Sequence, residues 1–285
     1  MGGNISGLLA MAATAFLWSL AGLLIKLIDW NPVAIAGARS LIASAVIAWY
    51  LRRPIFHFSF PQIAAAVANA ATMLLFVSAN KTTTAANAIL LQYLAPVLTA
   101  VVAAPVLRER TRAEHSVAIA LVLIGMIVMF SDELGGGRSF GNALAVISAV
   151  TFSFFFIFMR MQKDGSPLES LLLSHWITAG ICLFVSLFLP APHVTARSLI
   201  AVALLGAVQM GLSAVLFSYA IRRVSAVSAN IVAIIEPVFN PLWVFLATGE
   251  APGVRTLLGG SLIILAVTAA SVISAGRRSG SEPAL

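Results

Sequence analysis

Apolar residues recur along the whole chain in blocks of about twenty, separated by short polar connections. A helix of about twenty apolar residues is long enough to cross the hydrocarbon core of a bilayer. We predict ten such helices. They cover residues 6–28, 32–51, 61–80, 84–106, 113–131, 139–161, 167–189, 197–220, 226–247 and 253–275. Because the connections are too short for a soluble domain, the predicted fold class is an all-α integral membrane protein.

The composition supports this prediction. Hydrophobic residues make up 60% of the 285 residues and charged residues only 9%, whereas about a quarter of a soluble domain is charged. The single cysteine, Cys182, lies inside a predicted span, so we expect neither an intramolecular disulfide nor a thiol metal cluster. No Lys or Arg precedes the first span, and more spans follow at once, so we interpret it as a retained helix and not as a signal peptide.

The net charge of +7 is unevenly divided between the two sets of connections. The segments that follow the even-numbered spans carry 11 Lys and Arg residues, and those that follow the odd-numbered spans carry 5. Basic connections stay on the cytoplasmic side of a membrane. We therefore predict a multi-pass protein of a bacterial cytoplasmic (inner) membrane with both termini cytoplasmic, and no nucleic-acid partner.

Two halves of the chain share a pattern. Pro96 is followed thirteen residues later by Glu109, and Pro237 is followed thirteen residues later by Glu250, which gives an offset of 141 between the halves. Earlier in the halves, an offset of 134 maps Gly7 onto Gly141. We interpret the chain as two five-helix repeats.

Their predicted bounds are residues 1–134 (helices 1–5) and 135–285 (helices 6–10). Since five is odd, the second unit enters the membrane from the opposite face, so the repeat is inverted. Inverted repeats are typical of transporters that work by alternating access to one central site.

The residues that carry the repeat also carry a family resemblance. The opening FLWSLAGLLIK, the second-span pattern NPVAIAGAR, and the paired segments YLAPVLTAVVAAPVLRE and IIEPVFNPLWVFLATGE resemble the EamA family of the drug/metabolite transporter superfamily. The resemblance implies two inverted five-helix repeats around a central cavity that helices 1–4 and 6–9 face, with helices 5 and 10 at the back. Within that family, the chain is most similar to exporters of aromatic and other neutral amino acids.

One departure from symmetry concerns Arg39 in the second span. Its counterparts in the second half are Ser174 and His175, which gives the arginine no basic equivalent. We assign Arg39 a gating or structural role.

The ninth span contains the strongest candidate residue, Glu236. Two prolines, Pro237 and Pro241, each remove a backbone donor and clash with the carbonyl four residues back, so they bend the helix beside Glu236 and Asn240. An ionisable group within a span costs about 3 kcal/mol and normally meets a partner or a wet cavity. We expect Glu236 to receive a substrate ammonium or to carry a coupling proton. The alternative is a structural tie between helices, for instance to Arg39.

The fourth span is the repeat partner of the ninth and places Gln92, Tyr93 and Pro96 at equivalent depth. Trp18, Tyr93 and Trp176 fall near mid-span, away from the interfacial belts, and are candidates for a stacking pocket. Five phenylalanines crowd the sixth span, and we expect most of them to meet lipid or neighbouring helices; they are Phe152, Phe154, Phe155, Phe156 and Phe158.

The remaining polar or soft mid-span candidates are His175, Gln209 and Met73. An amide can orient a ligand, a methionine can conform to varied side chains, and a histidine can donate to a carboxylate or take part in proton-linked gating. Interhelical hydrogen bonding is the alternative for each polar residue. No second histidine lies at metal-ligand spacing, so we expect no metal and no cofactor.

These features predict a transporter that exports amino acids, preferably aromatic and other neutral ones, by alternating access. A carrier of drugs, nucleosides or other small metabolites from the same family is the alternative. No Asp lies in a span core to support intramembrane hydrolysis, and no selectivity-filter segment supports a channel. We expect no enzymatic activity. Substrate, direction of flux and proton coupling stay open at this point.

Overall fold

The computed structural model describes residues 2–83, 88, 91–108, 113–131, 139–248 and 253–279, and every regular element in these ranges is a helix. The first half contains α1 (Gly2–Ser19), α2 (Ala21–Lys26), α3 (Pro32–Leu51), α4 (Phe60–Thr82), α6 (Ala95–Leu107) and α7 (Ala113–Phe130). The second half contains α8 (Ser139–Met161), α9 (Pro167–Ser186), α10 (Ala196–Leu204), the π-helix η1 (Leu205–Leu212), α11 (Ser213–Ile221), α12 (Ala226–Ala233), α13 (Ile235–Thr248) and α14 (Val254–Ser279).

Within the described residues, six helices are long and apolar enough to span a membrane, and four shorter apolar helices accompany them. The shorter ones are Ala95–Leu107, Ala113–Met129, Ala226–Phe239 and Val254–Ala270. Each of the ten predicted spans corresponds to one of these segments. The prediction of an all-α, multi-pass membrane protein is therefore confirmed.

Local sequence signals set several helix starts. The side chain of Asn31 accepts a hydrogen bond from the backbone N–H of Ala34 at 2.8 Å and caps α3, whose first residue is Pro32. The hydroxyl of Ser225 caps α12 in the same way, accepting from the N–H of Ser228 at 3.1 Å. Such caps satisfy backbone donors that have no partner inside the helix.

Three predicted spans are interrupted. The first is broken at Leu20, between α1 and α2, and the ninth at Ile234, between α12 and α13. The fourth has a turn at Tyr93 and Leu94 before α6 begins. We expected a bend from each proline of the ninth span. The break at Ile234 follows Ala233, the residue four positions before Pro237, as the clash with the carbonyl four residues back predicts, whereas Pro241 sits within the continuous helix α13.

The eighth span is one rod made of α10, η1 and α11. Its π-helical segment contains two glycines that face α3: a Cβ on Gly206 would meet the side chain of Ile42, and one on Gly211 would lie 2.9 Å from the Cβ of Val46. The absence of a side chain at these two positions lets α3 pack directly on the π-helix. Short π-helical stretches are frequent at functional sites.

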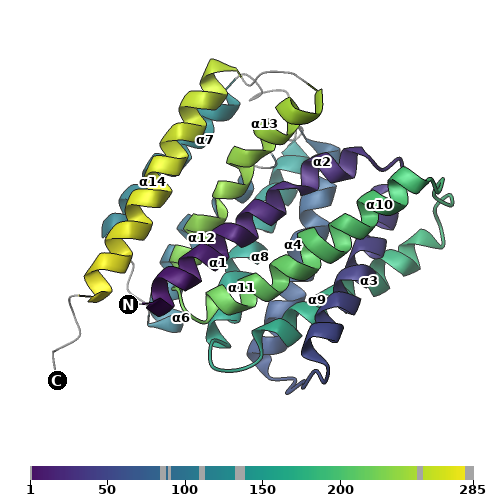
Figure 1. Cartoon of the computed structure of the whole chain (residues 1–285), viewed down its shortest axis with the longest axis horizontal. Helices are drawn as coiled ribbons and strands as arrows, with labels where there is room; N and C mark the ends of the chain where they lie inside the picture. Colours follow the sequence, from purple (N-terminus) through teal and green to yellow (C-terminus); the bar gives the residue numbers. More distant parts are fainter. Residues whose placement is uncertain are drawn as a thin grey trace.

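The helices are arranged with one close pair at each end. Helices α7 and α14 lie side by side at the left of Figure 1, and α3 packs against α9 at the other end. Helices α4, α8, α1 and α11 lie between these pairs, with α4 on α8 and α1 on α11. The first turn of α1 and the last turn of α14 lie at the same end of the molecule (Figure 1).

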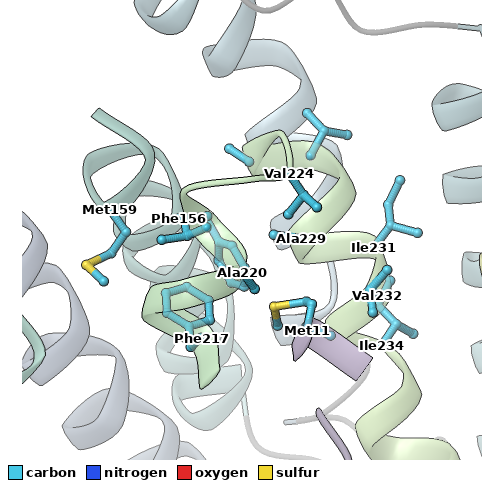
Figure 2. Close-up of a cluster of buried hydrophobic side chains, with 14 of the residues drawn as sticks. Met11, Phe156, Met159, Phe217, Ala220, Val224, Ala229, Ile231, Val232 and Ile234 are labelled. Carbon is cyan, nitrogen blue, oxygen red and sulfur yellow. The ribbon is translucent and has the colours of Figure 1, made fainter. Parts of the chain in front are cut away.

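The main hydrophobic core joins the two halves of the chain. Met11 from α1, Phe156 from α8, Phe217 from α11 and Ile234 between α12 and α13 are all 0% exposed and meet in one cluster (Figure 2). Large apolar side chains also cover much of the outside. Leu9, Val101, Leu246, Leu258 and Leu265 are all more than 60% exposed. An apolar exterior of this kind suits a lipid environment.

Candidate functional site

Two helix breaks meet at one hydrogen bond. Tyr93 lies in the turn before α6, and Glu236 is the second residue of α13. The hydroxyl of Tyr93 donates to an oxygen of Glu236 at 3.3 Å. Tyr93 is 5% exposed and Glu236 is partly buried. The most polar point of the ninth span thus lies against the equivalent point of the fourth.

The prolines explain why the helices break at these points. Pro96 is the second residue of α6 and Pro237 the third of α13, positions within the first turn where a proline costs no helical hydrogen bond. Four residues before them stand Gln92 and Ala233, and the helical path ends at or just after each. A continuous helix through either proline would lose a backbone bond and crowd the preceding carbonyl, so the chain restarts its helix there.

A pair of aromatic rings lies where α1 meets α8. The centroids of Trp18 and Phe152 are 6.5 Å apart, and Trp18 also contacts Phe217 of α11 at 5.8 Å. The indole N–H of Trp18 donates to the Oγ of Ser213 at 3.0 Å. Trp18 is the penultimate residue of α1, so its ring lies beside the break at Leu20.

One hydrogen bond links α8 to the break of the fourth span. The amide of Gln92 donates to the Oγ of Ser148 at 2.9 Å, and Ser148 lies one turn before Phe152 on α8. On the other side of the aromatic pair, the amide of Gln209 in η1 lies 3.5 Å from the carbonyl oxygen of Trp18. The Oε1 atom of Gln209 is buried and has no hydrogen-bond partner in the described part of the chain.

Glu236 is tied to another span, as the structural alternative from the sequence expected, but its partner differs from the example named there. We named Arg39, whereas Glu236 accepts its hydrogen bond from Tyr93. Arg39 is 7% exposed, and its electrostatic neighbours are His175 and Cys182 of α9. Because α13 packs on α1, α2 and α14 while α3 packs on α9 and η1, a tie between Glu236 and Arg39 is not formed.

The other candidates are distributed over the bundle. His175 is 1% exposed at the α3–α9 interface. Trp176 is 45% exposed and its ring contacts Phe56 at 5.3 Å, so it lies at the surface and not with Trp18. Met73 is partly buried on α4, and Pro96 is buried. Asn240 and Pro241 belong to α13, but their side chains are outside the described structure, as are Glu109 and Glu250.

Phe152 was expected among phenylalanines facing lipid or neighbouring helices, and we did not single it out as a partner for Trp18. The offset of 134 that relates Gly7 to Gly141 also relates Trp18 to Phe152, and this signal could have identified it. Ser148 and Ser213 carry no such signal, since small hydroxyl residues are common in spans.

In the described residues, no group of three or more His, Cys, Asp or Glu side chains is placed to hold a metal ion. The groups described above can form hydrogen bonds and stack on aromatic rings, and Glu236 adds a partly buried carboxyl. Broken helices that bring polar groups together inside a multi-span helical bundle are typical of membrane transporters.

Comparisons with known proteins give the family. The model of the EamA-like transporter family matches residues 5–131 and 139–272, and the chain belongs to this family. It is 28% identical over 203 residues to an uncharacterized transporter of Archaeoglobus fulgidus, covering 71% of this chain and 73% of that protein. A crystal structure with 22% sequence identity shares its fold at a TM-score of 0.83, covering 98% of this chain and 100% of the other. The chain is therefore a membrane transporter.

Proposed function

We propose that the protein exports amino acids, preferably aromatic and other neutral ones, by alternating access. The observation that carries this proposal is the Tyr93–Glu236 hydrogen bond at two helix breaks, with the Trp18–Phe152 pair on helices of the same bundle. An amino acid needs an acceptor for its ammonium, donors for its carboxylate and an apolar surface for its side chain. Glu236 serves the first need and the aromatic residues Trp18, Tyr93 and Phe152 the third.

Amide groups are the proposed donors to the carboxylate. Among the described residues, the buried oxygen of Gln209 has no hydrogen-bond partner and its amide nitrogen makes a long 3.5 Å contact, so this amide is the one proposed to turn toward a ligand. Gln92 is committed to Ser148 at 2.9 Å and orients the site by holding the fourth span against α8. Met73 on α4 and Asn240 on α13 complete the proposed set. Trp176 has no place in it, because its ring lies at the surface.

We further propose that residues 1–134 and 135–285 are inverted repeats. Equivalent residues make equivalent contacts, which supports this assignment. A Cβ on Gly7 would lie 2.7 Å from the Cβ of Arg223, and one on Gly141 would lie 2.7 Å from the Oγ1 of Thr82. The offsets are 134 for the glycines and 141 for their partners, as in the sequence. The two ranges that the family model matches fall one in each half.

Contacts between equivalent residues add support. Trp18 meets Phe152, and Gly125 of α7 packs on Gly259 of α14: a Cβ on Gly125 would lie 2.9 Å from the carbonyl oxygen of Gly259. Both pairs have an offset of 134. Residues that a two-fold axis exchanges can touch only near that axis. The proposed axis therefore passes between α1 and α8 and between α7 and α14.

The repeat supplies two proposed gates. The indole N–H of Trp243 on α13 donates to the Oγ of Ser19 on α1 at 2.8 Å, while the hydroxyl of Thr99 on α6 donates to the Oγ of Ser153 on α8 at 3.1 Å. Ser19 and Ser153 are equivalent by the offset of 134. In the inverted topology these contacts lie in opposite halves of the membrane, so opening one while the other holds gives access from one side at a time.

The proposed orientation has both termini in the cytoplasm of a bacterium, with the chain in the inner membrane. The charge difference between the two sets of connections supports this orientation. The position of the first turn of α1 and the last turn of α14 at one end of the molecule agrees with an even number of spans (Figure 1).

Purified protein in proteoliposomes tests the function. Labelled amino acids, nucleosides and cationic dyes would be compared in counterflow, with and without a pH gradient. We expect the fastest exchange with phenylalanine, tryptophan or other neutral amino acids. Exchange of nucleosides or dyes alone would favour the other carriers of the family, for which the carboxyl of Glu236 and the aromatic rings would serve a cationic or uncharged ligand. A gradient-dependent rate would establish proton coupling.

A further inference from the structure

A second polar cluster lies away from Glu236, at the interface of α3 and α9. Arg39 from α3 is 7% exposed and His175 from α9 is 1% exposed. The two side chains are close enough to interact electrostatically, and Arg39 also interacts with Cys182 two turns further along α9. The Nε of Arg39 and the Nδ1 of His175 are buried and have no hydrogen-bond partner in the described structure.

The cluster carries a positive charge that no carboxylate of the described residues is seen to balance. An arginine side chain stays protonated in proteins, and a charge inside a span normally faces an opposite charge or water. The described residues give Arg39 no ion pair with a carboxylate: its electrostatic neighbours are a histidine and a cysteine. Glu236 is bonded to Tyr93.

The surroundings of the cluster are closely packed. A Cβ on Gly37 would lie 3.1 Å from the Cβ of Cys182, so α3 and α9 approach tightly two residues before Arg39. On the other side, a Cβ on Gly206 of η1 would lie 2.9 Å from the carbonyl oxygen of Arg39. Helices α9 and η1 therefore enclose this part of α3 from two sides.

We propose that Arg39 and His175 form a binding site for one small monovalent anion, held by N–H donors of the guanidinium and the imidazole. The same chemistry is offered by a free halide and by the carboxylate of a small acid such as formate. Neither source is the amino acid proposed above, because its carboxylate lies one carbon from the ammonium that Glu236 is proposed to accept, and among the described residues α13 does not pack on α3. The site does not follow from the repeat, since Arg39 has no basic equivalent in the second half.

The first test measures thermal stability of the purified full chain in detergent, with sodium gluconate replaced stepwise by sodium chloride or bromide and no substrate present. A bound halide is expected to raise the melting temperature by roughly 5 °C at one hundred times its dissociation constant. Arg39→Gln and His175→Gln are expected to abolish the shift. Gly180→Ala, at an exposed position of α9 with nothing within 4 Å of the added Cβ, is the matched control and should keep it.

The second arm distinguishes the source of the anion. In gluconate, stabilisation by sodium formate but not by chloride or bromide, and its loss in Arg39→Gln, would assign the site to a carboxylate. If Arg39→Gln does not fold, bromide anomalous diffraction from the native chain decides, with a peak expected beside the Nε of Arg39. The proposal is overturned if neither halide nor carboxylate stabilises the native protein through these two residues. Its failure leaves transport at Glu236 untouched, because counterflow measures that separately.

Discussion

The hydroxyl of Tyr93 lies 3.3 Å from a carboxyl oxygen of Glu236 and donates a hydrogen bond to it. Each residue stands where its helix is interrupted, Tyr93 before α6 and Glu236 at the start of α13. A carboxyl at the first turn of a helix is stabilised by the free N–H groups there. The pair thus joins the fourth and ninth spans at a point where neither is a continuous helix.

The first prediction concerns this pair. Glu236→Gln keeps the size of the side chain and a hydrogen-bond acceptor but removes the ionisable oxygen, so counterflow of a neutral amino acid should fall at least tenfold while the melting temperature changes little. Tyr93→Phe removes one hydrogen bond worth about 1 kcal/mol, which corresponds to a loss of about fivefold. Unchanged rate and pH dependence in Glu236→Gln would remove both roles proposed for this carboxyl.

The aromatic residues give a second prediction with an internal control. Trp18→Ala removes the ring that contacts Phe152 and Phe217 and the donor to Ser213, so transport of phenylalanine should be lost. Trp176→Ala changes a ring that is 45% exposed and contacts Phe56, so transport should stay near the native rate. Both variants require a check of folding by size-exclusion chromatography. Equal loss in the two would contradict the placement of the site beside Trp18.

The gates can be tested by cross-linking. The hydroxyls of Thr99 and Ser153 are 3.1 Å apart, so cysteines at these positions are close enough to form a disulfide. In a chain with Cys182→Ser, the double variant Thr99→Cys and Ser153→Cys should stop transporting on oxidation and recover on reduction. The Cys182→Ser chain alone is the control and should be insensitive to oxidation. Full transport by the cross-linked protein would show that α6 and α8 do not separate during the cycle.

Helix packing gives a prediction on stability. A Cβ on Gly125 would lie 2.7 Å from the Cγ1 of Ile263, and one on Gly259 would lie 2.7 Å from the backbone nitrogen of Met129. Gly125→Ala and Gly259→Ala should each destabilise the protein by about 1 to 3 kcal/mol through overpacking. Gly180→Ala meets no atom within 4 Å and should stabilise by up to about 1 kcal/mol through helix propensity. Thermal unfolding in detergent measures all three, and a gain in the first two would argue against close contact of α7 and α14.

The number of spans and their helical, apolar nature could be predicted from the sequence. Bilayer thickness sets the length of a span, and each apolar block is long enough to be recognised as one. The sequence also predicted that Gln92, Tyr93 and Glu236 lie at the same depth in the membrane. The hydrogen bond between Tyr93 and Glu236 agrees with this prediction. The breaks were placed less well. Apolar residues flank Leu20 as evenly as any other point of the first span, so nothing in the pattern marks that interruption.

The side of the helix toward which each side chain points, core or lipid, was the main property that the sequence did not predict. Trp18 and Trp176 both fall near mid-span, yet one packs between α8 and α11 while the other lies at the surface. In a soluble protein the apolar face of a helix identifies the core, but in a membrane protein the outer face is also apolar. The π-helical segment around Gln209 could not be predicted for a related reason. An extra residue per turn does not change the hydrophobic pattern of a helix that is apolar on every side.

The inverted repeat is the central claim, and single-cysteine labelling tests it most directly. In the Cys182→Ser chain, Lys81→Cys and Arg222→Cys occupy positions related by the offset of 141. With a membrane-impermeant maleimide on intact cells, Lys81→Cys should be labelled at once and Arg222→Cys only after the cells are permeabilised. Labelling of both positions from the same side would contradict the inverted arrangement and, with it, the shared site at Glu236.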